Sequence, residues 1–375
     1  RMKARSADII VIGGGIAGVS AAAQCALDAQ VTLVEMESRP GLHATGRSAA
    51  FFSPAYGNAV VRDLTAASEH FFRSPPDGFV DVPLLRSRDC LFVGRHDQLQ
   101  SLADLETEVS LLRPVDTAAI GLRVPAFRAG YVAGGLYDTS GGDLDVDALH
   151  QGYLRQFHAR GGQLAIDSEV QSLRRVDGQW HVQTDKALYC APLVINAAGA
   201  WADAVAARAN LGPLGIEPRR RSVLLVDAPA QHDIADWPLV VDADEEFYFK
   251  PEAGQLLLSL ADETPSPPCD VRPEELDLAI AIDRVSKALD IEVRRINHSW
   301  AGLRSFAPDS TFVVGEDPRA DGFFWLAGQG GYGIQSAPAL AHLTTWLVTG
   351  QTPPADFAAV VDHCDTVTPV RLIDT

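Results

Sequence analysis

The chain has 375 residues, of which 47% are hydrophobic and 21% charged, a composition typical of a globular enzyme long enough for two joined domains. Its formal net charge of −18 excludes polyanion-binding classes, because nucleic acid and anionic membrane would be repelled. No apolar run approaches the roughly 20 residues needed to span a bilayer. The five scattered cysteines predict neither a disulfide framework nor a metal site, and they favour a cytoplasmic location.

The N-terminal region predicts one compact βαβ unit. The basic start at residues 1–3 is followed by an apolar run, 8–12, that is too short for the core of a signal peptide, and we expect Arg1 to be an addition ahead of a natural start at Met2. This run instead predicts a buried parallel strand, followed by a helix over 17–27 and a strand over 31–35.

Later elements follow from hydrophobic periodicity and capping residues. Asn58 is expected to cap a helix with Val61, Leu64, Ser68 and Phe71 on one face. Further helices are predicted at 97–112, from Asp145 or Asp147 to 160, at 273–289 and at 334–348. Strands are predicted at 163–184, 187–197, 216–226, 247–250, 255–260, 291–304 and 323–326.

Residues 13–18 match the dinucleotide-binding pattern G-x-G-x-x-G directly after a strand. Gly13 permits the tight turn, Gly15 lets the backbone approach a pyrophosphate, and Gly18 lets helix and strand pack closely. Glu35 ends the second strand, 20 residues after Gly15, where a carboxylate accepts hydrogen bonds from ribose hydroxyls and disfavours a 2′-phosphate. The sequence therefore predicts a dinucleotide site rather than a glycine turn without a ligand.

Three further segments distinguish FAD from NAD. Segments rich in small residues lie at 41–50, 196–201 and 327–334, far apart in the chain. Segments of small residues let the backbone approach a ligand closely, and three of them suit a long buried cofactor better than a nicotinamide held at the surface. The last one lies between a strand and a helix, whose N-terminus could stabilise negative charge on a reduced flavin.

On these motifs the chain resembles the D-amino acid oxidase family of FAD enzymes and, within it, the bacterial D-arginine dehydrogenases. The segments that carry the resemblance are 11–18, 45–50, 55–57, 147–154, 196–201, 220–222, 247–248, 300–306 and 329–335. The fold expected is α/β, with a Rossmann-like FAD-binding domain (1–79, 143–204 and 301–375) and an inserted α+β substrate-binding domain (80–142 and 205–300). The resemblance implies that the inserted domain is built on a large mixed sheet.

The motifs and the resemblance together predict the residues that contact FAD: Gly13, Gly15, Ala17, Gly18, Glu35, Met36, Ala44, Thr45, Gly46, Arg47, Ser48, Ala49, Ala50, Val170, Gly199, Gly330, Gly331, Tyr332, Gly333, Ile334 and Gln335. Sarcosine oxidases of the same family attach FAD through a cysteine just before an aromatic-x-x-Pro-Asp stretch. The comparable stretch here, 302–309, contains no cysteine. FAD is therefore expected to be bound non-covalently.

A buried substrate carboxylate needs a charged and preferably bidentate donor. Arg221 and Arg304 are candidates, although a lone strand arginine is more often a solvated group or an ion-pair partner. The resemblance implies Tyr56, Arg221, Tyr248 and Arg304 around the carboxylate and the backbone carbonyl of Gly331 at the amine. Strand alternation separates Arg221 from Arg220 and turns the Tyr248 hydroxyl away from its phenylalanine neighbours.

The residues expected around the substrate side chain are Phe51, Ser53, Cys90, Leu239 and Val241. D-arginine dehydrogenases have a guanidinium-binding glutamate where this chain has Cys90, and an active-site histidine where it has Phe51. Asp89 could replace the missing charge only if the strand register shifted, because alternation points it to the opposite face. The sequence therefore predicts a D-amino acid with an apolar or small side chain rather than D-arginine.

The activity implied is hydride transfer from Cα to flavin N5, giving an imine that hydrolyses to a 2-oxo acid and ammonia. The electron acceptor, oxygen or a quinone, stays open, and a small-molecule amino acid is the expected partner. One alternative is an oxidase of secondary or N-methyl amino acids, as in sarcosine oxidation. A second, of another class, is a flavin-binding module without turnover, and a third is an NAD-dependent dehydrogenase.

Overall fold

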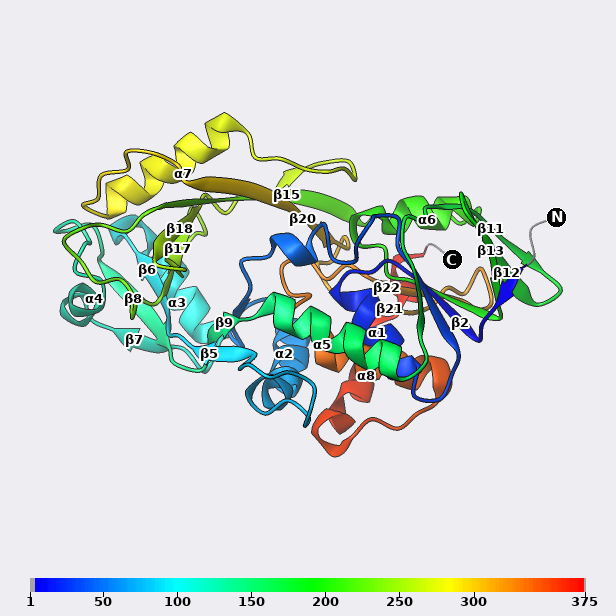
Figure 1. Ribbon diagram of the computed structural model, residues 1–375. Coiled ribbons are helices and arrows are strands. Elements are labelled where there is room, and N and C mark those ends of the chain that lie inside the picture. The colour runs from blue at the N-terminus through cyan, green and yellow to red at the C-terminus, as the bar shows by residue number, and fades with distance from the viewer. Residues whose placement is uncertain (1–3, 374–375) are drawn as a thin grey trace.

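The computed structural model describes residues 4–373, so the expectation about Arg1 lies outside the described residues. The molecule is elongated, with a helix-covered parallel sheet towards one end and a large mixed sheet towards the other (Figure 1). Two long strands, β15 (Glu217–Asp227) and β20 (His298–Phe306), pair with each other along the top of the molecule in this view. This arrangement confirms the predicted α/β fold with a large mixed sheet.

The first sheet has six strands and is parallel except at one edge, where β21 pairs antiparallel with β22. Its order is β10 (Gln163–Ala165), β3 (Val31–Val34), β2 (Ile9–Ile12), β14 (Leu193–Asn196), β22 (Phe323–Ala327) and β21 (Val313–Glu316). β2 and β3 are fully buried runs, as a parallel strand covered on both faces requires.

Different layers cover the two faces of this sheet. On one face, Val11, Leu33 and Phe324 pack against helices, and on the other, Ile10 and Trp325 pack against a second sheet. The helices are α1 (Ile16–Cys25), α2 (Ala59–Arg73), α5 (Val146–Ala159) and α8 (Ala337–Thr349). The second sheet runs in the order β1 (Arg5–Ser6), β13 (Leu188–Ala191), β12 (Gln179–Thr184) and β11 (Val170–Val176), beside α6 (Ala202–Arg208).

The large mixed sheet has nine strands, and β20 pairs with β15 beside the main path. Along that path lie β19 (Thr264–Pro265), β15, β18 (Gln255–Ser259), β17 (Tyr248–Glu252), β16 (Leu239–Asp242), β6 (Cys90–Gly94), β8 (Gly134–Asp138) and β7 (Arg113–Val115). A small sheet of β4 (Phe51–Phe52), β9 (Gly142–Leu144) and β5 (Leu85–Ser87) lies beside it.

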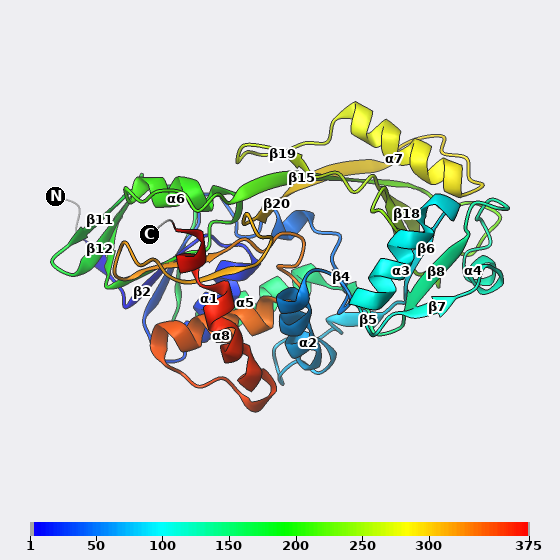
Figure 2. The same cartoon turned by 180° about the vertical axis from the view of Figure 1, so that it is seen from behind.

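Alternation along these strands separates an apolar core from a face turned to the functional site. Phe247, Phe249 and Leu224 point to the core, which α4 (Thr117–Arg123) and α7 (Glu275–Ala288) cover from outside (Figure 2). Arg221 and Tyr248 point the other way. The predicted separation of Tyr248 from its phenylalanine neighbours is confirmed, and a strand of period 2 produces it directly.

Caps and ends agree with the sequence in most helices. The side chain of Asn58 accepts a hydrogen bond from Val61 N at 3.1 Å, and Asp145 caps α5 through Ala148 N at 2.9 Å. Two predicted elements were too long. The helix predicted at 97–112 ends as α3 (Leu99–Glu108), and the strand predicted at 291–304 begins only at His298.

The physical reason for the first error is burial outside regular structure, whereas residues 291–297 are mostly exposed and form no ladder. Val109 and Leu112 continue the apolar spacing of α3, but they pack into a satellite core from the loop after it. Within residues 4–373, no helix is both long and apolar enough to cross a bilayer. The boundaries of the two discontinuous domains remain our proposal.

Candidate active site

A long cleft runs between the six-stranded sheet and the mixed sheet, with about 1680 Å³ of empty space including the part open to solvent. One end is lined by the glycine loop before α1 and by residues 35–49. The other end is lined by Arg221 and Tyr248 of the mixed sheet and by residues 302–305 and 329–334. Segments far apart in the sequence thus line one cavity, as the predicted three-segment cofactor site requires.

The glycine loop at the N-terminus of α1 has no room for side chains at its key positions. Gly13 has φ +108°, and a Cβ there would lie 2.3 Å from Ala197 O. At Gly18 a Cβ would lie 1.8 Å from Gly13 O, so this glycine serves helix–strand packing and not the cleft wall. Gly15 lines the cleft, where its missing side chain leaves backbone free to approach a ligand.

The carboxylate of Glu35 closes this end of the cleft. Its two oxygens accept hydrogen bonds from Gly14 N at 2.7 Å and from Glu37 N at 2.8 Å, and the residue is buried. Burial raises the pKa of this carboxyl group, although the two backbone donors lower it in part. Glu35 therefore ties the end of β3 to the glycine loop.

The wall opposite α1 is built by residues 44–49. Thr45 Oγ1 accepts a hydrogen bond from Ile16 N at 2.9 Å, and so occupies the helix N-terminus. Arg47 donates to the carbonyls of Val271 at 3.0 Å and of Ala301 at 3.4 Å and pairs with Asp270 at 2.5 Å. These contacts join the small-residue segment to the mixed-sheet side of the cleft.

Most of the predicted FAD residues line the cleft. They are Gly13, Gly15, Ala17, Glu35, Met36, Ala44, Thr45, Arg47, Ser48, Ala49, Val170, Gly199, Gly330, Gly331, Gly333 and Ile334. Gly18, Gly46, Ala50, Tyr332 and Gln335 do not line it. Gln335 is buried beside it, where its Oε1 accepts from Ser53 N at 3.0 Å and its Nε2 donates to Thr65 at 3.0 Å.

At the substrate end, Arg304 is the central group. It is half-buried and reaches Tyr56 Oη only at 3.4 Å, and no carboxylate among residues 4–373 pairs with it. Burial would lower the pKa of Arg304, but the hydroxyl groups of Tyr56 and Tyr248 raise it, and the raised value keeps the guanidinium charged. A charge in this position favours an anionic ligand.

Arg221 lines the same cleft but is already paired. Its Nε donates to Asp262 O at 2.8 Å and its Nη2 lies 3.2 Å from Glu263 Oε1. Arg219 shares this face through its own contact with Glu263, whereas Arg220 pairs with two acidic residues of the α7 region. The predicted alternation of the three arginines is confirmed. The two guanidinium groups differ, however, because only Arg304 is without a carboxylate partner in the described chain.

Gly331 lies directly against Arg304. A Cβ on Gly331 would be 2.7 Å from Arg304 Nη1, so any side chain at this position would displace the guanidinium. Tyr56 does not line the cleft itself, but its ring packs edge-on to Tyr332 with centroids 4.9 Å apart, and its hydroxyl reaches Arg304. The structure therefore brings four of the five predicted catalytic residues to the cleft wall and holds the fifth behind Arg304.

The predicted side-chain pocket is less open. Phe51, Cys90, Leu239 and Val241 meet in one apolar cluster beneath α3, but none of them lines the cleft. Cys90 is 1% exposed, so its thiol is closed off from the cleft. Ser53 lies apart from the cluster, where its backbone contacts Gln335. Phe51, Leu239 and Val241 remain partly exposed, so of the four only Cys90 is closed off.

The prediction from the sequence did not include three polar groups in the cleft wall. His43 Nδ1, Ser305 Oγ and Gln329 Nε2 are buried without a hydrogen-bond partner in the described part of the chain. His43 also binds Glu37 at 2.7 Å and packs on Trp201. His43 and Gln329 lie inside the small-residue segments, and that position was the only signal available. These orphaned groups, the side-chain-free glycine loop and the length of the cleft fit a bound FAD.

Together, fold and cleft define a dinucleotide-binding α/β oxidoreductase. Residues 8–347 match the DAO family model, FAD dependent oxidoreductase, and the chain belongs to this family. It therefore depends on FAD. Two relatives, from Xenopus laevis and from Bos taurus, carry the name FAD-dependent oxidoreductase domain-containing protein 1. They are matched over only 34% and 45% of their length, so the chain spans less than half of each.

Several similar proteins are named as oxidases or dehydrogenases of an amino acid. A glycine oxidase from Pseudomonas aeruginosa is 26% identical, with 93% of this chain and 98% of that protein covered. The crystal structure of glycine oxidase from Geobacillus kaustophilus superposes with a TM-score of 0.82 at 21% identity, covering 94% of this chain and 98% of that one. L-proline dehydrogenase from P. horikoshii gives 0.81 at 19% identity, with 98% of both chains covered. These structures share the fold, and none of these relatives singles out a D-arginine dehydrogenase.

Proposed function

We propose that this protein oxidises an amino acid at the carbon that bears its amine. The observation that carries the proposal is Arg304, a charged and half-buried guanidinium without a carboxylate partner in residues 4–373, set against Gly331 in the wall of the FAD cleft. An α-amino acid supplies the missing carboxylate and places its amine one carbon away. The names of the glycine oxidases among the relatives support an amino acid as substrate.

Each site residue has a part in this reaction. Arg304 and the remaining donors of Arg221 bind the carboxylate, Tyr248 fixes its orientation through its hydroxyl, and Tyr56 positions Arg304 from behind. The carbonyl of Gly331 accepts a hydrogen bond from the amine, which favours the orientation that exposes the adjacent C–H bond. FAD, when bound, supplies the acceptor for the hydride from that carbon. The imine product then hydrolyses to a 2-oxo acid and ammonia.

The side chain accepted is small or apolar. The cluster of Phe51, Cys90, Leu239 and Val241 is apolar, and none of its members lines the cleft. The carboxylates nearest Cys90 are already engaged, because Asp138 accepts hydrogen bonds from Ser140 and Asp89 accepts one from the Tyr137 hydroxyl. Burying a cation there without a counter-ion would cost about 2–5 kcal/mol. We therefore favour D-alanine, D-leucine or glycine over D-arginine, with the D configuration taken from the family resemblance.

A second candidate is the oxidation of a secondary or N-methyl amino acid. Its support is a relative named 4-methylaminobutanoate oxidase (formaldehyde-forming) from Paenarthrobacter nicotinovorans, 24% identical over 94% of this chain and 44% of that protein. The carboxylate end would be bound in the same way. The two candidates differ in whether the nitrogen carries a second carbon, and an apolar cluster that does not line the cleft suits either one.

The test is anaerobic reduction of the flavin by a panel of amines, followed by absorbance. The panel contains D-alanine, L-alanine, D-leucine, glycine, sarcosine, D-proline and D-arginine. We expect D-alanine, glycine or sarcosine to reduce the flavin fastest and D-arginine to be poor. Faster reduction by D-arginine than by D-leucine would contradict the side-chain argument. A flavin that no amine reduces would instead support a binding module. Acid precipitation should release FAD into the supernatant if it is bound non-covalently.

A further inference from the structure

The second guanidinium of the site is compensated by a carboxylate of the protein. Glu263 Oε1 lies 3.2 Å from Arg221 Nη2, and Glu263 Oε2 lies 3.3 Å from Arg219 Nη1. The Arg221 side chain is 6% exposed and the Glu263 side chain 40%, so the pair lies where the buried cleft wall meets solvent. The substrate end therefore carries one uncompensated positive charge, that of Arg304, and not two.

The position of Glu263 is fixed by its neighbour. Asp262 is buried and accepts hydrogen bonds from Ser222 N at 2.6 Å and from Ser222 Oγ at 2.8 Å, while its carbonyl accepts from Arg221 Nε. Ser222 follows Arg221 in β15, so these contacts hold the segment after β18 against the strand that carries the guanidinium. Glu263 is thus built into the site and is not a mobile surface group that happens to lie nearby.

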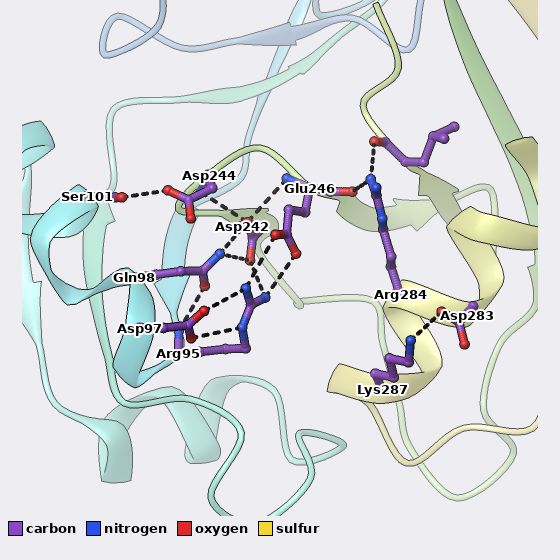
Figure 3. Close-up of polar contacts among 11 residues, drawn as sticks. Arg95, Asp97, Gln98, Ser101, Asp242, Asp244, Glu246, Asp283, Arg284 and Lys287 are labelled. Atoms are coloured by element: carbon purple, nitrogen blue, oxygen red, sulfur yellow. Dashed lines mark hydrogen bonds and ion pairs between the residues drawn. The ribbon is translucent and has the colours of Figure 1, made fainter.

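A second acidic turn is joined to the segment that leads to Glu263. The turn between β16 and β17 is fixed by the buried carboxylate of Asp242, which accepts from Gln98 Nε2 at 3.0 Å and from the backbone nitrogens of Asp244 and Glu246 (Figure 3). Arg284 of α7 binds the carbonyl of Glu246 at 2.6 Å, as Figure 3 shows, and that of Leu260 at 3.2 Å. The same side chain therefore ties this turn to the segment that leads to Glu263.

Both loops carry negative charge towards the site. Glu245 lies at the tip of the turn with φ +56°, between the two backbone nitrogens that Asp242 holds. Burial raises the pKa of the Tyr332 hydroxyl, Tyr56 raises it further and Arg304 lowers it, and the carboxylates of Glu245 and Glu263 make smaller contributions that raise it. Tyr332 packs on Tyr56, which reaches Arg304. Tyr332, Tyr56 and Arg304 therefore form one connected group at this end of the cleft.

We propose that Glu263 determines substrate specificity by restricting the site to substrates with a single carboxylate. This inference rests on the proposed function. Glu263 neutralises Arg221, so the site has one free positive charge, which matches one carboxylate. A second carboxylate on the substrate would meet the Glu263 charge within about a Debye length of 8–10 Å, with no free guanidinium left to bind it. Amino dicarboxylates and iminodicarboxylates are disfavoured for this reason.

The test compares Glu263→Gln with Glu217→Gln. Glu217 pairs with Arg219 Nε at 2.7 Å on the same strand but does not contact Arg221, so it is a matched control for charge removal. The readout is the ratio of kcat/KM for a dicarboxylate to that for its monocarboxylate counterpart, iminodiacetate against sarcosine and D-aspartate against D-alanine. We expect Glu263→Gln to raise this ratio about tenfold and the control to leave it unchanged.

A merely structural role for Glu263 would give a different result. Loss of Arg221 positioning would lower kcat/KM for both members of each pair and leave the ratio as it is, and that outcome would overturn the proposal. If Glu263→Gln does not fold, the wild-type protein still tests the idea by ionic strength. Added salt screens the Glu263 charge together with the rest of the negative net charge, so the ratio should rise with salt, and a ratio that does not change would also overturn the proposal.

A binding measurement separates this proposal from the proposed function. Acetate and malonate are titrated into the FAD-loaded protein, and binding is followed by the change in flavin absorbance. The wild-type protein should bind acetate more tightly than malonate, and Glu263→Gln should reduce or reverse this order. If this preference is observed but no amine is oxidised, the result would support the role of Glu263 in excluding dicarboxylates and contradict the proposed function. Oxidation of an amino acid without any change in the acetate-to-malonate preference would do the opposite.

Discussion

Replacement of Arg304 by leucine tests the central interaction of the site. Arg304 is half-buried, contacts Tyr56 at 3.4 Å, and pairs with no carboxylate in residues 4–373. When a substrate carboxylate binds, removal of its charged partner leaves that carboxylate buried and uncompensated. Such a loss costs about 2–5 kcal/mol. At about 1.4 kcal/mol per tenfold change, kcat/KM should fall by about 30-fold to several thousand-fold.

The free energy of unfolding should change little in the same variant. Arg304 forms one long hydrogen bond and no ion pair in the described structure, so its removal leaves no carboxylate unpaired. We expect a loss of less than about 1 kcal/mol, or a small gain, because leucine needs no hydration in the cleft wall. A large fall in activity with intact stability is the signature of a binding group and not of a structural one.

The assay is anaerobic stopped-flow reduction of bound flavin, with FAD content and urea unfolding measured on the same preparation. Arg295→Leu is the control, because this arginine is exposed and distant from the cleft wall. Unchanged kcat/KM in Arg304→Leu, with FAD fully bound, would refute the reasoning. A fall in kcat/KM caused only by loss of FAD would also count against it, since Arg304 is assigned to the substrate.

Gly331→Ala should lower kcat/KM at least about tenfold with FAD retained, because the new Cβ would lie 2.7 Å from Arg304 Nη1; flavin reduction measures this. Glu35→Gln should weaken FAD binding about tenfold, because an amide has one acceptor oxygen for the two backbone donors that Glu35 now holds; flavin fluorescence measures the Kd. Burial lowers the pKa of His342 to about 4. The neutral ring therefore stabilises the fold above pH 6.5, and this contribution is lost as pH falls towards 4, by about 2 kcal/mol between pH 7 and pH 5. In urea unfolding His342→Gln should lose this dependence and the exposed His298→Gln should keep it.

The parts of the fold with local rules could be predicted well. The βαβ unit with Gly13, Gly15 and Gly18 can be predicted from strand burial and glycine sterics alone. Both properties depend on residues that are neighbours in the sequence. Helix caps at Asn58 and Asp145 follow for the same reason. Element ends were less predictable. The apolar spacing of α3 continues into a loop, and only packing decides where the helix stops.

Local rules are sufficient to predict the glycine loop, the acidic residue at the end of β3, and the face of each strand on which Arg221 and Tyr248 lie, because side-chain period and glycine conformation depend on neighbouring residues. The tertiary structure alone decided the charge state of the site. Glu263 lies 42 positions after Arg221 in the chain, and only the pairing of β15 with its neighbours brings their side chains to 3.2 Å. It also decided that Cys90 is buried, since burial depends on which distant segments pack over a residue. A sequence pattern names the groups that can meet, but the electrostatics of a site depend on which of them are already paired.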